Sequence, residues 1–372
     1  MLFFINIIIL IFNINFFYKS RTINIFKNIK TNIDKKIDIY RNVDYFPLKL
    51  FLKSYKKIAE YLTNKYYTKK DKLLSDFNNG KNNTIKTVKI YYVDLHPRFI
   101  NLIKSDLKGK INIQIDKENP DYLLYATHGC HCMNIKYKNA IKLAFFTENQ
   151  IPDLHFTDYA VGFSHISYLD RFFIYPYFIY HMIMNKVNKE TIIKAREKVL
   201  KSPNRTKFCG AVITNPSGSR IMFINLLNKY KKIDMGGRYR NNVGGPVRRK
   251  RNFLSSYKFS ICMENSEGDG YITEKIIDGF LAGTIPIYYG DYTFDEYINP
   301  KSFILIRNRN DVYKKINYIK KIDNDDELYK KILKEPIFMK DVFFEKIDKS
   351  RKSFLLNIFQ QKKELAKRID NY

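Results

Sequence analysis

The segment Phe259–Gly290 holds most of the residues in this 372-residue chain whose types and spacing could carry chemistry. Its order of apolar runs, glycines and turn residues predicts a strand, a glycine loop, a helix and a second strand, which together form one βαβ unit. Thr273 is the expected N-cap, which places Glu274 and Lys275 in the first helical turn. Helix N-terminal amides favour a phosphate there, and the positive charge of Lys275 would strengthen its binding.

Glu274 and Lys275 allow two interpretations. In the first, Lys275 stabilises the negative charge that develops on a departing phosphate group, and Glu274 holds sugar or ribose hydroxyls. In the second, Glu274 only complements the helix dipole and Lys275 is solvated. Position alone does not separate the two.

Arg220 repeats this arrangement earlier in the chain. It follows the predicted strand Phe208–Thr214 and a short turn, at the start of a predicted helix, and its planar guanidinium suits bidentate phosphate binding. A surface arginine is the plainer interpretation of any single Arg, but two cations at two helix starts favour a diphosphate site. The glycine pairs at 236–237 and 244–245 flank a loop that could close over such a ligand.

Glu148 directly follows the predicted strand Leu143–Thr147. A carboxylate at the carboxyl end of a buried strand, facing a cleft, is a candidate general base, and we expect burial there to suit it to that role. The alternative is an ordinary loop carboxylate. Asp158 is a rival base, although it stands where the next strand begins.

The hydrophobic pattern predicts an α/β protein. Strand-like runs alternate with helical or turn-rich segments, which indicates βαβ units and largely parallel sheets. We therefore expect two Rossmann-type domains that face a central cleft, with an extra hydrophobic and helical segment at the amino end. The predicted strands of the first domain are Val88–Val93, Ile111–Ile115, Tyr122–Ala126, Leu143–Thr147 and Tyr159–Phe163.

The domain organisation that we predict has five parts. They are a membrane tether (1–18), a stem or accessory helical segment (19–86), an acceptor-side Rossmann-like domain (87–200), a donor-binding Rossmann-like domain (201–335) and a basic C-terminal helical tail (336–372). The tether is an apolar run of marginal length for a spanning helix, and no small-residue cleavage site follows it, so it indicates a signal-anchor. The basic residues after the run favour a cytoplasmic body, whereas a Golgi-like enzyme has the opposite orientation, and we leave the orientation open.

The net charge of +29 is compatible with acidic partners, but lysine is spread along the chain rather than clustered. Four cysteines, Cys130, Cys132, Cys209 and Cys262, are too unevenly spaced for a disulfide framework. The cluster at 128–132 (His-Gly-Cys-His-Cys) resembles a metal site, but it lacks the usual two-residue gap and a second group of ligands. A structural loop is the favoured interpretation of that cluster.

The central motifs resemble the α-1,3-fucosyltransferase family (glycosyltransferase family 10). The residues that carry the resemblance are Glu264-Asn265-Ser266, Tyr271-Ile272-Thr273-Glu274-Lys275 and Gly283-Thr284-Ile285-Pro286-Ile287-Tyr288-Tyr289-Gly290, with Phe208-Cys209, Asn215-Pro216, Arg220 and Gly236-Gly237 upstream. Weaker similarity extends back to about Val88, through Phe146-Thr147-Glu148-Asn149 and Asp158-Tyr159.

The resemblance implies a GT-B fold with GDP-L-fucose in the second domain, and transfer with inversion to a glycan acceptor, by family expectation the 3-OH of N-acetylglucosamine. By position, Glu148 matches the general base, and Arg220 and Lys275 match the diphosphate cations. Donor sugar or nucleoside contacts are implied for Asn265, Tyr271 and Glu274. Thr147 departs from the glycine that family members often have before this Glu. We expect no essential metal, because no Asp-x-Asp signature stands between a strand and the donor loop, although Mn²⁺ could stimulate activity.

Three alternatives stay open. The chain could be a GT-B transferase with another nucleotide sugar or linkage. It could also be a basic nucleic-acid-binding protein, although it has no recognised nucleic-acid-binding motif, and we expect no nucleic-acid partner. An inactive membrane-tethered scaffold is the third alternative, and the joint presence of Glu148, Arg220 and Lys275 argues against it.

Overall fold

The computed structural model describes residues 85–367, apart from residues 128, 130, 166–168, 202–204, 292–296, 309 and 340–343. The predicted tether (1–18) and nearly all of the predicted accessory segment (19–86) lie outside the described residues. Within the described part, no helix is both long enough and apolar enough to cross a membrane.

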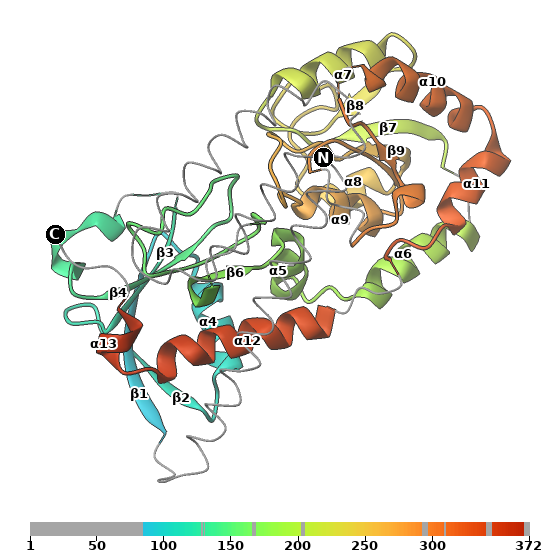
Figure 1. Cartoon of the computed structure of the whole chain (residues 1–372). Helices are drawn as coiled ribbons and strands as arrows, with labels where there is room; N and C mark the ends of the chain where they lie inside the picture. Colours follow the sequence, from blue (N-terminus) through green and yellow to red (C-terminus); the bar gives the residue numbers. More distant parts are fainter. Residues whose placement is uncertain are drawn as a thin grey trace, which may run out of the picture. The chain divides into compact units, whose positions relative to one another are not determined.

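The first domain is built on a six-stranded parallel sheet with the order β2-β1-β3-β4-β5-β6 (Figure 1). Every residue of β3, β4 and β5 is buried except Lys142, as expected for parallel strands that are covered on both faces. Helix α4 (Pro97–Asp106) connects β1 to β2, and its N-cap His96 accepts a hydrogen bond from the backbone of Arg98. The strands are β1 (Lys86–Val93), β2 (Ile111–Ile115), β3 (Tyr122–Ala126), β4 (Ile141–Phe145), β5 (Tyr159–Gly162) and β6 (Phe172–Ile174).

The second domain is built on a five-stranded parallel sheet with the order β11-β10-β9-β7-β8. Its strands are β7 (Lys207–Ala211), β8 (Ile233–Met235), β9 (Tyr257–Ile261), β10 (Ile285–Tyr288) and β11 (Ile304–Leu305). Helices α7 (Gly218–Asn228), α8 (Lys250–Leu254), α9 (Glu274–Leu281), α10 (Asp311–Asp323) and α11 (Asp326–Lys334) surround this sheet in Figure 1.

Both sheets are doubly wound, and in each the strand order reverses next to the first strand of its series. In the first sheet β1 lies between β2 and β3, and in the second β7 lies between β8 and β9. Loops at such a switch point diverge to opposite faces of the sheet, which leaves a crevice at the carboxyl ends of the strands. The predicted fold class of two Rossmann-like domains is confirmed.

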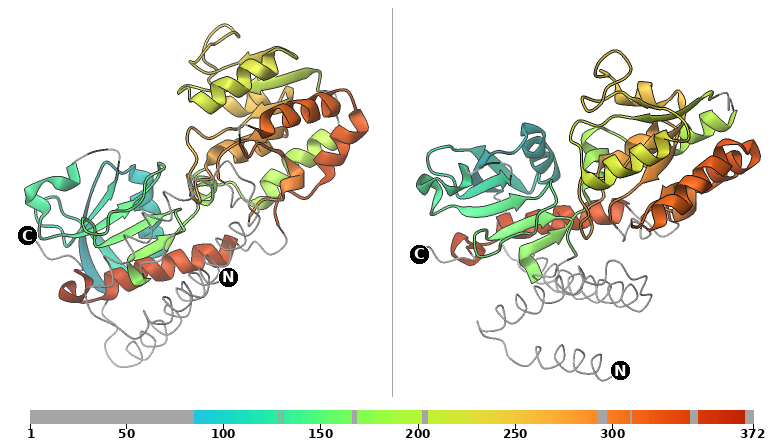
Figure 2. Two further views of the ribbon diagram at one scale, coloured as in Figure 1. Left: turned by 45° about the horizontal axis from the view of Figure 1, so that its top comes forward. Right: turned by 90° about the horizontal axis from the view of Figure 1, so that it is seen from above.

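Helices outside the two strand series join the domains. Helix α5 (Tyr177–Met184) contacts α9, and α6 (Lys189–Lys201) contacts both α9 and α11, so α6 packs with the second domain. Further along the chain, α12 (Phe344–Gln360) and the short α13 (Lys363–Ala366) return to the first domain. Figure 2 shows α12 running alongside the strands of the first sheet.

The contact of α12 with the first sheet is aromatic and buried. Phe354 is 1% exposed, and its ring packs against Phe173 and against the edge of Tyr159. The hydroxyl of Tyr122 donates to the carbonyl of Ile358 across the same contact at 3.0 Å. The core of the first domain therefore includes residues from the end of the chain.

Some predicted strand ends differ from the structure. The strand predicted as Phe208–Thr214 is β7, which ends at Ala211. Strand β4 ends at Phe145, two residues before the predicted Thr147, because pairing with β5 stops at Phe145 and Val161. The short strand β6 was not predicted from the sequence, because its residues are all apolar and show no alternation of polar and apolar side chains.

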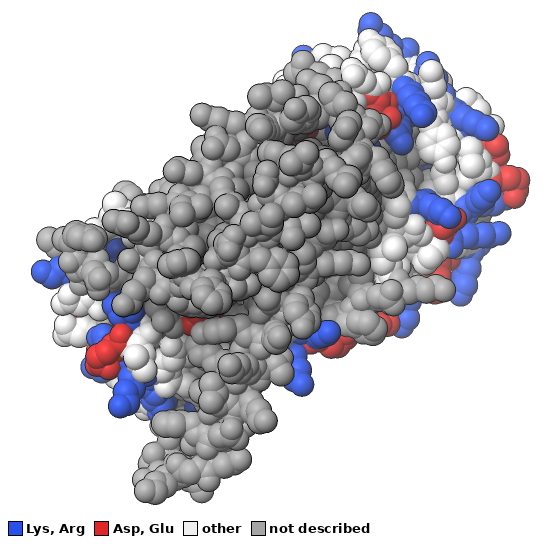
Figure 3. Space-filling view, viewed as in Figure 1, with Lys and Arg blue, Asp and Glu red and all other residues white. Residues whose placement is uncertain are grey.

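Charged side chains are interspersed rather than gathered by sign. On the described part of the face in Figure 3, Lys and Arg alternate with Asp and Glu. This agrees with the even spread of lysine along the sequence.

Truncating Phe354 tests the role of α12. We expect Phe354→Ala to cost about 3–5 kcal/mol of stability, the usual loss for a fully buried phenylalanine. Leu365→Ala is the matched control, because Leu365 is 62% exposed. Urea unfolding of both variants measures the difference, and equal midpoints would contradict a core that depends on α12.

Candidate active site

The start of α9 lies at the carboxyl end of β9, as the sequence predicts. Thr273 is the N-cap, and its side-chain oxygen accepts a hydrogen bond from the backbone N–H of Lys275. Ile276, Ile277 and Phe280 are buried, and the left-handed backbone of Gly283 (φ 71°) follows the helix end. The predicted N-cap and helix start are confirmed.

The ammonium group of Lys275 lies among oxygen atoms. Its Nζ is 2.8 Å from Glu264 Oε2, 2.9 Å from Thr273 Oγ1 and 3.3 Å from Glu274 Oε1. Burial alone would lower the pKa of Lys275, but Glu264 and Glu274 outweigh it and raise this pKa above its ordinary value. These carboxylates therefore favour the protonated, positively charged form of Lys275 beside the helix start.

Arg220 lies in the first turn of α7 but turns its guanidinium inward. The side chain is buried, with Nη1 donating to the carbonyl of Asn215 at 2.6 Å and Nη2 to that of Met263 at 2.7 Å. These carbonyls follow β7 and β9, so Arg220 ties together the two loops of the switch point. Its Nε has no hydrogen-bond partner among the described residues. Burial lowers the pKa of Arg220, opposed by Glu264.

Glu148 meets the second domain through Tyr271. The Tyr271 hydroxyl donates to Glu148 Oε2 at 3.2 Å, and Asn265 Oδ1 lies 3.5 Å from the same hydroxyl. Burial, with Glu264 and Glu148 nearby, raises the pKa of Tyr271, so it remains a donor. Glu148 itself is exposed, contrary to our expectation of burial, because β4 ends three residues earlier and Glu148 lies in the loop beyond it.

The glycine loop between β9 and α9 contacts the first domain closely. Asn149 Nδ2 donates to Ser266 Oγ at 2.9 Å and to the carbonyl of Glu267 at 2.6 Å. A Cβ on Gly268 would lie 2.0 Å from the Asn149 side chain, and one on Gly270 would lie 2.0 Å from the backbone oxygen of Phe163. Gly270 requires glycine for this approach, because its backbone is left-handed and the atom it would meet belongs to the main chain, whereas at Gly268 the Asn149 side chain would have to move.

A histidine and an aspartate make a further contact beside the glycine loop. The Nδ1 atom of His165 is 2.6 Å from Asp269 Oδ1, and its backbone N–H donates to Asp269 Oδ2. The side chain of His165 is largely buried. This pair and Asn149 hold the loop against the first domain.

Tyr177 is a site residue that the sequence did not reveal. It opens α5, and its pKa is raised to about 12 by burial, with Glu274 and Glu148 as the next contributions. The backbone N–H of the next residue, Phe178, donates to the carbonyl of Ile272 in the glycine loop between β9 and α9. Tyr177 therefore lies near both Glu148 and Glu274, and nothing in its local sequence marks it.

The structure places the rival base Asp158 elsewhere. Asp158 precedes β5 and is fully buried, where it accepts a hydrogen bond from the backbone of Lys142 at 2.8 Å and faces Lys367 Nζ at 3.4 Å. This is the amino edge of the sheet, opposite Glu148. Asp158 therefore organises the start of strands β4 and β5.

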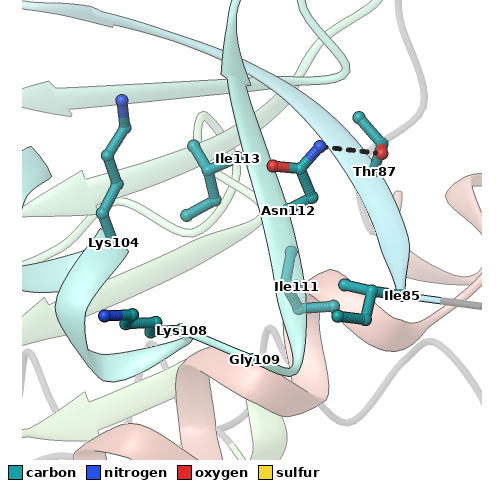
Figure 4. A pocket seen from close by; sticks show the side chains of 8 residues that line it. All are labelled: Ile85, Thr87, Lys104, Lys108, Gly109, Ile111, Asn112 and Ile113. Carbon is teal, nitrogen blue, oxygen red and sulfur yellow. Dashed lines mark hydrogen bonds between the residues drawn. The ribbon is translucent and has the colours of Figure 1, made fainter.

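A hollow of about 500 Å³ also lies away from the site. Thr87 and Asn112, hydrogen-bonded to each other, line it together with Lys104 and Lys108 of the α4 region (Figure 4). It opens where β1 and β2 begin, whereas ligands of doubly wound sheets bind where strands end.

No metal site is evident in the part of the chain that the structure describes. No group of three His, Cys, Asp or Glu side chains is gathered there in a way that could hold an ion. His128 and Cys130 of the sequence cluster lie outside the described residues. His131, from the same cluster, pairs with Asp94 at 2.6 Å.

Solved structures share this fold. The chain matches a crystal structure of an α1,3-fucosyltransferase at 26% identity and a TM-score of 0.62, over 74% of this chain and 92% of that one. A crystal structure of α1,3-fucosyltransferase with GDP-fucose matches at a TM-score of 0.59 and 24% identity. Two doubly wound domains with a cation-bearing switch point thus define the chain as a protein of the GT-B class.

Family models and curated relatives agree with this class. The C-terminal model of glycosyltransferase family 10 (fucosyltransferase) matches residues 202–349, and the N-terminal domain model of α-(1,3)-fucosyltransferase FucT matches residues 88–181. The chain belongs to glycosyltransferase family 10.

Among the relatives is α-(1,3)-fucosyltransferase FucT of Helicobacter pylori, 32% identical over 229 residues, which cover 54% of this chain and 48% of the relative. Human 4-galactosyl-N-acetylglucosaminide 3-α-L-fucosyltransferase 9 is 30% identical over 138 residues, which cover 35% of this chain and 37% of the relative. The chain spans about half or less of the length of these relatives.

Replacing glycine in the loop tests its docking. Gly270 (φ 77°) and Gly244 (φ 85°) share a left-handed backbone, but a Cβ on Gly244 meets nothing within 4 Å. We expect Gly244→Ala to cost about 1–2 kcal/mol for the backbone conformation alone. Gly270→Ala should cost clearly more, because its Cβ also collides with the first domain. Thermal melting compares the two, and equal losses would contradict the docked loop.

Proposed function

We propose that this chain is an inverting glycosyltransferase that transfers L-fucose from GDP-β-L-fucose to a glycan hydroxyl, by family expectation the 3-OH of N-acetylglucosamine, which would give an α-1,3 linkage. We further propose that residues 1–18 tether it to a membrane as a signal-anchor, with the orientation left open. Membership of family 10 supports the donor and the reaction.

One observation carries the proposal. Glu148 from the first domain and Lys275 from the second are both linked to the loop that contains Tyr271 and Thr273, through hydrogen bonds of 3.2 Å and 2.9 Å. The predicted base and the predicted phosphate-binding cation would thus flank the donor sugar from opposite sides. This is the arrangement that a direct displacement requires, with the acceptor on one side of the sugar and the leaving group on the other.

The proposed reaction is a single displacement. Glu148 accepts the proton of the acceptor hydroxyl while that oxygen forms a bond to the anomeric carbon of fucose. The bond between this carbon and the β-phosphate oxygen breaks, and GDP leaves with the electron pair. Attack opposite the leaving group converts the β-linked donor into an α-linked product.

The negative charge on the departing GDP needs stabilisation, and three groups could supply it. Lys275 keeps its proton, the start of α9 presents backbone N–H groups, and Arg220 has N–H capacity left beyond its two carbonyl contacts. The main contribution of Arg220 would be structural, because its hydrogen bonds hold together the two loops that would surround the diphosphate.

The other predicted donor residues lie around Lys275. Burial would raise the pKa of Glu274, but Lys275 and Lys250 outweigh it and lower this pKa, so Glu274 stays ionised and can accept hydrogen bonds from sugar or ribose hydroxyls. Asn265 and Tyr271 lie on the side that faces Glu148. Tyr271 would then orient the base as well as contact the donor.

Removing the base tests the proposal directly. In Glu148→Gln we expect acceptor-dependent GDP release from GDP-fucose to fall by about 10²–10⁴-fold, the usual contribution of a general base. N-acetyllactosamine serves as the acceptor. Asp158→Asn is the matched control and should retain its rate per folded molecule, because Asp158 lies at the opposite edge of the sheet.

Other outcomes would redirect the proposal. GDP release that ignores Glu148→Gln would exclude Glu148 as the base. Turnover of GDP-mannose or a UDP-sugar in preference to GDP-fucose would replace the donor. A failure of GDP-fucose to turn over or to raise the melting temperature would contradict the donor site itself.

Metal dependence is a separate prediction. We expect fucose transfer to continue in EDTA, because protein cations replace a divalent ion at the diphosphate, and Mn²⁺ could still stimulate it. The measurement is the initial rate in EDTA against the rate with added Mn²⁺. Complete loss in EDTA that Mn²⁺ restores would show that the cations are insufficient.

A further inference from the structure

Glu264 is a fully buried carboxylate that the proposed reaction leaves without a role. It follows β9 by three residues, and its backbone N–H donates to the carbonyl of Tyr289, which continues the pairing of β9 with β10. The side chain is 0% exposed. Burying a carboxylate is costly unless it is paired and hydrogen-bonded, so its partners are informative.

The carboxylate is bonded to the start of α9. Glu264 Oε1 accepts from the backbone N–H of Thr273 at 2.9 Å, and the Thr273 hydroxyl lies 2.8 Å from both carboxylate oxygens. Oε2 faces the ammonium of Lys275 at 2.8 Å. One buried side chain thus holds both the helix cap and the predicted phosphate cation.

The fold leaves space for this carboxylate at Gly290. A Cβ on Gly290 would lie 2.6 Å from Glu264 Cγ, so a larger residue would push the side chain away from Thr273 and Lys275. Gly290 ends the segment after β10, and its φ does not require glycine. Close approach to Glu264 and to the Tyr288 hydroxyl is the physical reason for glycine there.

The three acceptors around Lys275 are not equivalent. The ammonium has three N–H groups, which face Glu264, Thr273 and Glu274. Glu264 and Thr273 are buried, whereas the side chain of Glu274 is 29% exposed and its contact, at 3.3 Å, is the longest. Glu274 is therefore the most accessible and the most distant of the three acceptors.

We propose that Glu264 is a positioning residue for the donor diphosphate: together with Thr273 it anchors two N–H groups of Lys275 and leaves the third, now on Glu274, for a phosphate oxygen. The inference rests on the proposed function and deepens it. Binding of the diphosphate frees Glu274, whose carboxylate then accepts a donor hydroxyl. Glu264 acts through Lys275 and touches no substrate atom.

The electrostatics of the site support this arrangement. Burial lowers the pKa of Lys275, but Glu264 and Glu274 outweigh it and raise this pKa. Burial also raises the pKa of Glu264, opposed by Lys275 and by the Thr273 hydrogen bond. Tyr177, Tyr271 and Arg220 face the same carboxylates from α5, the glycine loop and α7. Without the charge of Glu264, burial would lower the pKa of Lys275 relative to the native site, and its proton would be lost at a lower pH.

A double-mutant cycle tests whether Glu264 acts through Lys275. Glu264→Gln keeps the size of the side chain and can still accept from Thr273, but it has no charge for the ammonium. We expect it to weaken GDP binding and to lower kcat by about tenfold to a hundredfold, the effect of losing one charge-assisted hydrogen bond. In the Lys275→Met background the same substitution should change both quantities by less than about twofold, because coupled residues are not additive.

A purely structural role predicts different results. Asp323→Asn removes another buried carboxylate of this domain, which pairs with Lys231, and should lower the melting temperature without changing kcat. For Glu264→Gln we expect, in addition, that the alkaline limb of the pH–rate profile moves to lower pH. Additive effects in the cycle, or an unmoved alkaline limb, would overturn the proposal.

Two further measurements keep the test decisive. If Glu264→Gln does not fold, Gly290→Ala displaces the same carboxylate, and the cycle with Lys275→Met is run on that variant with the same expected non-additivity. GDP binding by calorimetry does not require turnover. A wild-type protein that binds GDP but transfers nothing would contradict the proposed function alone, whereas additive losses of GDP affinity would contradict the role of Glu264 alone.

Discussion

Parallel pairing throughout both sheets decides where polar side chains can gather. Each strand of a parallel sheet ends at the same edge, so the loops after β7 and β9 must meet, as must those after β1 and β3. The interior of each sheet is apolar, and chemistry is confined to these edges. Arg220, Glu264 and Lys275 come from two strand–loop–helix units of one sheet and converge for this reason alone.

Burying these charges is possible because each has a specific partner. Arg220 is bonded to two backbone carbonyls, and Glu264 to a backbone N–H, a hydroxyl and an ammonium. An isolated buried ion would be far too costly. The same hydrogen bonds and ion pair fix the geometry of the loops. They therefore both stabilise the buried charges and make the site rigid.

The sequence predicts the elements whose signals are local. The N-cap Thr273, the apolar face of α9 and the terminating Gly283 follow from capping and periodicity within a dozen residues. The six predicted site residues lie around one site for a longer-range reason, since the strand–helix alternation identifies the edge at which each must lie. Their roles as base and donor ligands remain predictions.

What the sequence could not provide depends on contacts between distant segments. Tyr177 faces Glu148 and Glu274 only because α5 packs on α9, and Asn149 meets Ser266 across 117 residues of chain. The inward turn of Arg220 depends on the carbonyl of Met263, which no pattern around residue 220 reveals. Glu148 proved exposed because strand pairing, rather than hydrophobicity, sets the end of β4.

The return of α12 to the first sheet has a consequence for synthesis of the chain. A ribosome releases the first domain's strands, from β1 to β6, more than 150 residues before it releases helix α12 (Phe344–Gln360). Until then Tyr122, Tyr159 and Phe173 lack the side chains that cover them in the finished protein. The first domain to be translated is thus completed last, and aromatic surface that is uncovered during that interval makes a folding chain prone to aggregation.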